Sequence, residues 1–464
     1  MNTYTTPHRK SRLALHTSRL TRYALLLLPL LFLALFYFYP LAAIFGASFA
    51  GSAWADVTAR LFSTTTLRVL GFTFGQATLS TALTLLLGLP GAYVFARYEF
   101  PGKALLQALA TVPFVLPTVV VAAAFTALWG SSSPLRYTLG AILLAHVFYN
   151  VTLVLRLVGG FWANLDPRLE EAARTLGASP WRAFREVTLP LLAPALGAAA
   201  LLVFVFCFTS FGVILVLGGP RFTTLEVEIY RQTIAFANLP LAAALGLVQL
   251  LITLALTLTY TRLQARLARP LELRPQWATQ RRPHKPAEIA LLLATVTLLG
   301  LLLAAPPLTL VARSFDGGLR YYAALFENPR RSIFYVPPIA AVWNSVRFAL
   351  ATMALALLLG LLTSLALYRQ RQGWLLDALF MLPLGTSAVT LGLGYLLGMS
   401  RPPLALRGTP LLIICGHTLV ALPFVVRSLL PALHSIRPTL REAAATLGAP
   451  PARVFVEVDL PIIQ

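Results

Sequence analysis

The chain contains little cysteine, little acid and little charge of either sign. Its 464 residues include two cysteines, Cys207 and Cys415, both inside apolar runs. We expect these thiols to be packing residues, so the composition offers neither a disulfide framework nor a thiolate metal site. Charged residues make up 11% of the chain and hydrophobic residues 58%, whereas an average soluble domain has roughly 25% charged residues. This balance excludes a soluble enzyme.

Acidic residues are especially scarce. The chain has 37 lysines and arginines against 16 aspartates and glutamates, a formal charge of +21, and the charge is concentrated between apolar runs. A basic face on a soluble fold would indicate nucleic-acid binding, but basic loops beside long apolar segments are typical of the cytoplasmic side of a membrane. We therefore expect a lipid bilayer as the environment and no nucleic-acid partner.

Apolar segments long enough to cross a bilayer recur along the whole chain. Ten spans are predicted, at 23–48, 69–95, 104–129, 139–161, 192–217, 241–260, 288–312, 343–368, 375–399 and 409–433. Five basic residues and no acidic one precede the first span, which places the N-terminus in the cytoplasm. That span is too long for a signal-peptide core and lacks a cleavage pattern, so we expect an uncleaved anchor. The predicted fold is an all-α, polytopic membrane protein.

One polar segment occurs twice. Glu170–Pro190 (EEAARTLGASPWRAFREVTLP) returns without a gap as Arg441–Pro461 (REAAATLGAPPARVFVEVDLP), 271 positions later. A fixed period of this length indicates duplication. We therefore expect two parallel halves, 1–260 and 288–464, joined by a basic cytoplasmic linker at 261–287. Both repeated loops then lie on the cytoplasmic side, and the substrate route runs between the halves.

Each copy of the loop, 166–190 and 437–461, is predicted to form a helix, a tight turn and a second helix. In the first copy a helix-forming run ends at Gly177, which can adopt the left-handed conformation that terminates a helix. Ser179 then supplies an N-cap, followed by a proline at the first helical position. The second helix has one apolar face, formed by Trp181, Phe184 and Val187. Two such polar loops beside a membrane domain require a partner.

The pattern of these loops resembles the EAA motif, the cytoplasmic signature of permease subunits of binding-protein-dependent ABC importers. Glu-Ala-Ala, three residues, glycine and a terminal Leu-Pro occur with the same spacing in both copies. The resemblance implies the MetI-like type I ABC importer permease fold. It assigns coupling to the ATPase to two matching sets: Glu171, Ala172, Ala173, Gly177 and Pro190, and Glu442, Ala443, Ala444, Gly448 and Pro461.

A chain with two such motifs resembles the double-length permeases of the ferric-iron and thiamine importers of prokaryotes. The resemblance implies an ATP-binding cassette subunit as partner, expected as a homodimer. A periplasmic or lipid-anchored substrate-binding protein would dock on the outer segments 218–240 and 313–342. Ferric iron is the expected cargo, with thiamine or another small solute such as a polyamine as the alternative.

Chemistry within the chain itself is not expected. It has no Gly-x4-Gly-Lys-[Ser/Thr] phosphate loop, so ATP hydrolysis belongs to a partner and the chain acts by alternating access. An intramembrane enzyme would need paired catalytic groups inside the spans, and no such pair occurs. A secondary transporter is the less favoured alternative, because it would not need the docking loops. No enzymatic activity and no cofactor are predicted.

Polar residues within the spans leave alternatives open. Thr209 and Ser210, beside a Phe-rich run, are weak candidates for the substrate pathway. His146 and His417 occupy equivalent positions, and we expect them to hydrogen-bond across helices rather than to bind a metal. No metal site is predicted.

Two arginines, Arg156 and Arg427, also occupy equivalent positions near the cytoplasmic ends of their spans. Snorkelling of the guanidinium groups to the interface is the expected role, and contact with substrate is the alternative.

The repeat also predicts the length of the second half. Two spans follow the loop in the first half, whereas the sequence ends at Gln464, three residues after Pro461. The period of 271 carries position 260 to position 531. Two further helices, in about 67 residues beyond Gln464, are therefore expected from the repeat.

Overall fold

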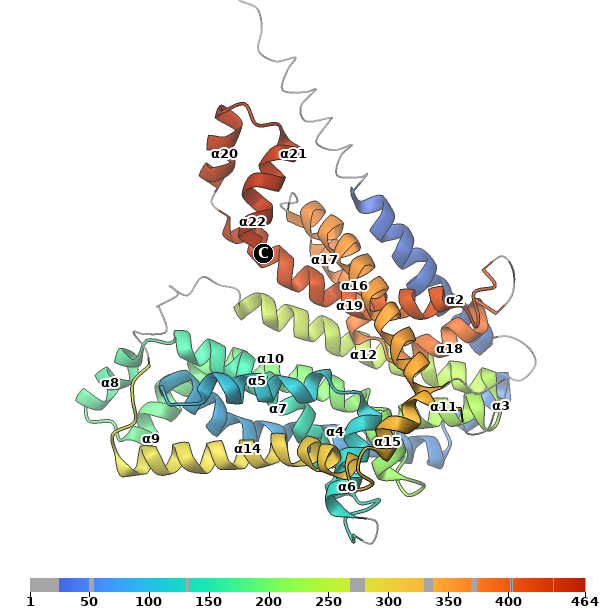
Figure 1. Cartoon of the computed structure of the whole chain (residues 1–464), viewed down its shortest axis with the longest axis horizontal. Helices are drawn as coiled ribbons and strands as arrows, with labels where there is room; N and C mark the ends of the chain where they lie inside the picture. Colours follow the sequence, from blue (N-terminus) through green and yellow to red (C-terminus); the bar gives the residue numbers. More distant parts are fainter. Residues whose placement is uncertain are drawn as a thin grey trace, which may run out of the picture. The chain divides into compact units, whose positions relative to one another are not determined.

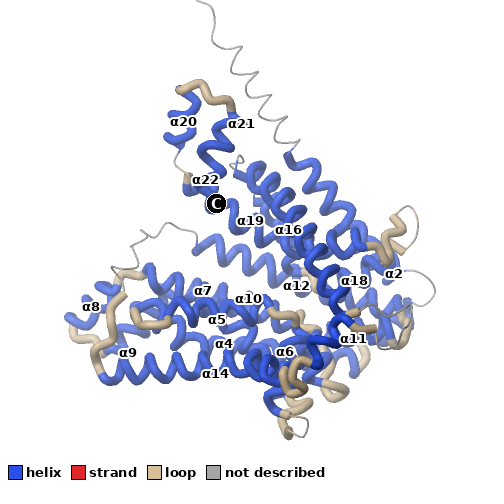
Figure 2. The backbone as a smooth tube through the Cα atoms, viewed as in Figure 1, coloured by secondary structure: helices blue, strands red, loops and turns tan. Residues whose placement is uncertain are grey.

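The computed structural model describes residues 25–49, 54–130, 133–267, 280–328, 337–368, 374–400, 402, 404–436 and 438–463. In these residues every regular element is a helix (Figure 2), and the β-type contact is an isolated bridge between Tyr98 and Arg281. The expected all-α fold is confirmed. The basic N-terminus and residues 268–279 of the predicted linker lie outside the described residues.

Eight described helices are long and apolar enough to cross a membrane: Leu25–Phe49, Thr64–Arg97, Leu139–Asn164, Pro180–Phe208, Leu239–Leu263, Pro286–Ser314, Pro338–Tyr368 and Pro410–Ser435. The other two predicted spans, 104–129 and 375–399, are pairs of shorter helices bent by 112° and 94°. Counting each bent pair as one span gives ten. In the first pair the break falls at Leu116, which is extended because Pro117 follows it. In the second, Ser387 caps a new helix.

The chain divides into two compact units. The central unit is Ser48–Ala324, and the terminal unit combines Met1–Ala47 with Leu325–Gln464. The helices of the central unit are α3 (Trp54–Leu61), α4 (Thr64–Arg97), α5 (Lys103–Val115), α6 (Thr118–Trp129), α7 (Leu139–Asn164), α8 (Pro167–Thr175), α9 (Pro180–Ala183), η2 (Phe184–Thr188), α10 (Leu189–Phe208), η3 (Ile214–Gly218), α11 (Leu225–Ile234), α12 (Leu239–Leu267), α14 (Pro286–Ser314) and α15 (Arg320–Ala323).

The terminal unit begins with the helix from Leu25 to Phe49, which includes η1 (Ala34–Phe38) and α2 (Tyr39–Phe49). Its other helices are α16 (Pro338–Tyr368), α17 (Trp374–Met381), η5 (Leu382–Gly385), α18 (Ala388–Gly398), α19 (Pro410–Ser435), α20 (Pro438–Thr446), α21 (Pro451–Val454), η6 (Phe455–Asp459) and α22 (Leu460–Ile463). The short helix η4 (Ala324–Phe326) lies where the central unit ends.

The compact units differ from the halves expected from the repeat, because each contains the first helix of the other half. In the terminal unit, Leu33 and Tyr37 of the N-terminal helix share a core with Leu419 of α19. In the central unit, α14 packs against α4, α5 and α6, and Figure 1 shows it running along these helices. The halves 1–260 and 288–464 thus remain a prediction about the repeat, and packing follows other boundaries.

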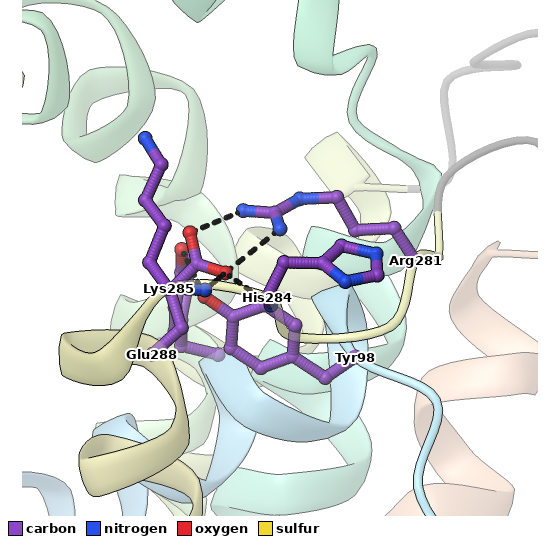
Figure 3. A network of polar contacts seen from close by, with 6 residues as sticks. Tyr98, Arg281, His284, Lys285 and Glu288 are labelled. Atoms are coloured by element: carbon purple, nitrogen blue, oxygen red, sulfur yellow. Dashed lines mark hydrogen bonds and ion pairs between the residues drawn. The ribbon is translucent and has the colours of Figure 1, made fainter.

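A polar network fixes the start of α14 to the end of α4 (Figure 3). The Arg281 guanidinium donates two hydrogen bonds, of 2.9 and 2.8 Å, to the Glu288 carboxylate and lies 5.3 Å from the ring centroid of Tyr98. The backbone N–H groups of His284 and Lys285 also donate to Glu288. The Glu288 hydrogen bond raises the pKa of Arg281. This network holds the end of the linker on the central unit.

Element bounds in the second half repeat those of the first. Helices α7, α8, α9 and η2 each recur 271 positions later, as α19, α20, α21 and η6, with the same length. The bent pair of α5 and α6 likewise corresponds to the second bent pair. The duplicated sequence therefore forms the same local structure twice.

The π-helices have a common sequence cause. Each of η1, η2, η3 and η6 is followed by one residue and then a proline: Pro40, Pro190, Pro220 and Pro461. Proline lacks an N–H and its ring clashes with the carbonyl four residues earlier, so a wider turn before it relieves the conflict. The Leu-Pro ending of each loop therefore does not interrupt the second helix. In the first copy this helix continues unbroken from Pro180 to Phe208.

One segment expected as an outer loop contains a helix with a buried inner face. Within 218–240, α11 packs against α12 and α4, and Leu225, Val227 and Ile229 are fully buried. The backbone N–H of Leu225 donates to Thr73 Oγ1 of α4 at 3.0 Å. The exposed residues of this segment are Pro220, Arg221, Tyr230 and 234–237.

Candidate functional site

The candidate site consists of two helical hairpins, residues 167–190 (the first hairpin) and 438–461 (the second hairpin). Gly177 and Gly448 have φ of 91° and 84°, so the predicted left-handed turn is confirmed in both. The turn satisfies carbonyls at the end of the preceding helix: the Ala178 N–H donates to Ala173 at 3.1 Å, and that of Ala449 to Ala444 at 3.1 Å. A side chain at either glycine would meet open space, so backbone conformation alone requires glycine.

The motif residues have the same exposure in the two hairpins. Glu171 and Glu442 are exposed, and their carboxylates form no ion pair with any described residue. Of the paired alanines, Ala172 and Ala443 are exposed, while Ala173 and Ala444 are half-buried; Pro190 and Pro461 are exposed. The two predicted coupling sets therefore present equivalent surfaces to solvent.

Two leucines that the sequence interpretation missed are the most exposed large apolar residues in the hairpins. Leu176 and Leu447, each directly before the turn glycine, are both 89% exposed. Leu169 and Leu440, two turns earlier on the same helical face, are 49% and 47% exposed. A leucine held in solvent at the same place in both copies indicates a contact surface. The signal available in the sequence was the identity of both pairs at the period of 271.

The first hairpin is closed by a hydrogen bond between its two helices. Thr188 Oγ1 donates a 3.2 Å hydrogen bond to Glu170 Oε2, and Arg97 at the end of α4 lies within electrostatic range of Glu170. The predicted N-cap is confirmed, since Ser179 Oγ accepts from the Arg182 N–H at 3.3 Å.

Aromatic rings extend the apolar face of the first hairpin into the core. Phe184 stacks between Trp181 and Trp162, with centroids 5.7 and 6.0 Å away, and Trp162 contacts Tyr93 of α4 at 5.2 Å. Trp181 itself is 69% exposed at the outer end. The ring column thus links the tip of the hairpin to a membrane-spanning helix.

The second hairpin is closed by an ion pair at the same two positions. Arg441 Nε donates to Asp459 Oδ1 at 2.6 Å, and its guanidinium also hydrogen-bonds with the Tyr368 hydroxyl and lies 4.7 Å from that ring centroid. Burial disfavours the charge on Arg441, but the hydrogen bonds and charge interactions with Asp459 and Tyr368 together outweigh it and raise the pKa of the guanidinium. Glu170 and Thr188 thus become Arg441 and Asp459, and Tyr368 at the end of α16 takes the place of Arg97 as the contact from a spanning helix. We call each triad a clamp, because it joins both hairpin helices to the end of a spanning helix.

The predicted pathway residues lie beside a buried polar cluster of the central unit. Both ring nitrogens of His146 are engaged by hydroxyls, Nδ1 with Ser80 at 2.8 Å and Nε2 with Ser210 at 2.9 Å. The expectation that His146 hydrogen-bonds across helices is confirmed. Thr209 is half-buried and donates to the Val205 carbonyl of its own helix. His417 is exposed in the terminal unit.

Comparison with known proteins identifies the class of molecule that carries these hairpins. Residues 88–269 match the family described as the inner membrane component of binding-protein-dependent transport systems. The thiamine transport system permease protein of Salmonella typhimurium is 31% identical over 382 residues, covering 78% of this chain and 69% of the relative. Its counterpart in Brucella abortus is 31% identical over 439 residues, covering 89% and 78%.

A shorter relative matches one half of the chain. The sulfate transport system permease protein of Escherichia coli is 30% identical over 256 residues, covering 52% of this chain and 91% of the relative. The family consists of membrane transport permeases rather than enzymes. On the extent of these matches and on its apolar helices, this chain belongs to the multi-pass inner-membrane permeases of binding-protein-dependent ABC importers.

Proposed function

We propose that this permease moves thiamine, rather than the ferric iron expected from the sequence, and that both hairpins couple it to ATP-binding subunits. Thiamine is supported by the names of the relatives from Salmonella typhimurium and Brucella abortus. A substrate-binding protein delivers the cargo, and alternating access carries it across the cytoplasmic membrane. The N-terminus and both hairpins face the cytoplasm.

The observation that carries the coupling role is a pair of solvent-exposed leucines, Leu176 and Leu447, at the same position in two hairpins with the same backbone turn. An exposed apolar side chain at the tip of a polar hairpin is stabilised when a partner buries it. Two equivalent surfaces in one polypeptide fit two copies of one partner, which supports a homodimer of ATP-binding cassette subunits.

The roles within each hairpin follow from exposure. Glu171 and Glu442 offer unpaired carboxylates to a partner, and the exposed Ala172 and Ala443 allow its close approach. The glycines set the angle between the hairpin helices, and the prolines sit where the second helix continues into the membrane. Fusion of the two permease halves in one chain is the remaining part of this proposal, supported by the recurring helix bounds.

The coupling role is tested by replacing both leucines. In membranes that also contain the ATP-binding subunit, Leu176→Ser with Leu447→Ser is expected to reduce co-purification of that subunit at least tenfold, because two buried leucines are lost from the contact. Leu319→Ser is the matched control, since Leu319 is 71% exposed outside the hairpins. Unchanged co-purification in the double variant would refute the docking role.

The cargo is tested separately in proteoliposomes containing the permease, its ATP-binding subunit and its binding protein. We expect ATP-dependent uptake of labelled thiamine and none of ferric iron. Uptake of iron without thiamine would reverse the assignment, and the docking result would be unaffected.

A further inference from the structure

A cavity of about 1170 Å³ opens in the central unit between α5, α7 and the start of α14. Its apolar wall includes Phe95, Ala110 and Leu155. Its rim carries three basic residues from three different elements, Lys103, Arg156 and Arg282, against one acidic residue, Glu99. A cavity with buried apolar residues in its wall and an excess of basic residues in its lining fits an amphiphile with an anionic head.

The rim cations retain free hydrogen-bonding capacity. Lys103 Nζ donates one hydrogen bond, of 2.9 Å, to the Tyr98 carbonyl, which leaves two of its three N–H groups. Arg156 Nη2 donates to Thr111 Oγ1 at 2.8 Å and forms no ion pair with the described residues. Arg282, which follows Arg281 of the network at Glu288 in the chain, also lines the cavity and likewise forms no ion pair with the described residues. The rim can therefore bind an anion with several donors.

The duplicated half shows that an arginine at this position is otherwise neutralised. Arg427, equivalent to Arg156, donates to Asp377 Oδ2 of α17 at 3.1 Å. In this part of the repeat Leu105–Leu109 (LLQAL) returns 270 positions later as Leu375–Leu379 (LLDAL), so the position equivalent to Asp377 is Gln107 and the position equivalent to Lys103 is Gly373. The first half thus keeps the arginine, lacks its carboxylate and adds a lysine. This leaves a positive charge at the cavity that no described residue balances.

We propose that this cavity is a binding site for an anionic phospholipid. The phosphate lies among Lys103, Arg156 and Arg282, and one acyl chain follows the wall formed by Phe95, Ala110 and Leu155. Because α14 and the linker end form one side, the bound lipid connects the beginning of the second repeat to α5 and α7. The proposal goes beyond transport and depends on neither the cargo nor the hairpins.

The test uses the full-length chain purified in a neutral detergent and native mass spectrometry with added lipid. We expect one phosphatidylglycerol to be retained in preference to phosphatidylcholine of the same acyl composition. Arg156→Gln with Arg282→Gln should weaken this binding about 25-fold, about fivefold for each cation removed. Arg427→Gln is the matched control and should leave phosphatidylglycerol binding unchanged. Equal retention of the two lipids, or equal loss in the control, would overturn the proposal.

A second variant separates a lipid from a free phosphate and does not touch the cations. Gly160 lines the cavity on α7, and a side chain there would meet open space. Gly160→Leu should fill the acyl channel and reduce phosphatidylglycerol binding at least fivefold, while helicity and the elution profile stay as in the parent. If 10 mM inorganic phosphate displaced the lipid completely, or if the Gly160 variant bound it normally, the occupant would be a phosphate ion and the lipid assignment would be wrong.

Discussion

The first and second hairpins have the same backbone and the same outward-facing residues, but they are closed by different chemistry. Leu176 and Leu447 are equally exposed, and both turn glycines are left-handed. The inward-facing clamps differ: a hydrogen bond between Glu170 and Thr188 in one copy, an ion pair in the other. Features that both copies share point to the partner, whereas features that differ are alternative solutions to packing the hairpin on its own helices.

The clamps should differ most in their response to truncation. Arg441→Ala leaves the Asp459 carboxylate, 11% exposed, without its ion-pair partner, and is expected to destabilise the second hairpin by about 2–3 kcal/mol. Glu170→Ala removes a hydrogen bond from a neutral donor and a longer-range attraction to Arg97, and should cost the first hairpin about 1.5 kcal/mol. Hydrogen exchange of residues 167–190 and 438–461 in the purified chain measures both. Equal loss of protection would contradict the difference between the clamps.

Exchanging the clamps sharpens the comparison. Glu170→Arg with Thr188→Asp transplants the ion pair, but Arg97 then faces a like charge, so protection of the first hairpin should fall below that of the parent. Adding Arg97→Tyr removes this like charge and supplies an aromatic hydroxyl of the kind that Tyr368 offers in the second hairpin, so it should restore protection. If the double and triple variants were equally protected, position 97 would not belong to the clamp.

The turn glycines should respond equally. Valine at position 177 or 448 is strained in the left-handed region by about 1–2 kcal/mol. A side chain at either position would meet open space, so the two sites do not differ sterically. We expect Gly177→Val and Gly448→Val each to reduce substrate-stimulated ATP hydrolysis by the reconstituted importer. Gly177→Asn and Gly448→Asn, which tolerate this conformation, serve as controls. A reduction confined to one copy would indicate that only one hairpin couples.

The smallest effect is expected at the exposed ion pairs on the second helix of each hairpin. Arg182 with Glu186 and Arg453 with Glu457 have the same four-residue spacing and similar high exposure. Such pairs are screened by salt and contribute little. Arg182→Gln and Arg453→Gln should therefore leave hydrogen exchange of both hairpins unchanged within error. A clear loss of protection in either would show that the pair is part of its clamp.

Local structure was the part of the molecule most accessible to sequence interpretation. Gly177 and Ser179 act on their immediate neighbours, so the turn and the N-cap were predictable from residue type. The bend at Leu116 also had a local signal in Pro117, but hydropathy over 104–129 outweighed it. Hydropathy reports burial in lipid and is insensitive to the direction of the chain.

Contacts between distant residues were not accessible in this way. The clamp residue Arg441 meets Asp459 across a turn, and Tyr368 comes from another helix, so no periodicity marks them. The paired change from Glu170 and Thr188 to Arg441 and Asp459 was the one available clue. No motif indicated the cargo, and the proposal of thiamine in place of iron rests on the names of relatives.

The placement of the first helix in the terminal unit has a consequence for biosynthesis. Its partners begin at α16, near Pro338, so almost 290 residues must be synthesised after Phe49 before they exist. At about 5–20 residues per second the helix waits roughly 15–60 s in the membrane. During that time the hydroxyl of Tyr37, which later hydrogen-bonds with Thr386, has no tertiary partner. By contrast, the packing partners of α14, helices α4 to α6, are synthesised before it. The N-terminal helix is therefore inserted before its packing partners exist, and α14 after its own. Premature release or misinsertion should affect the N-terminal helix first.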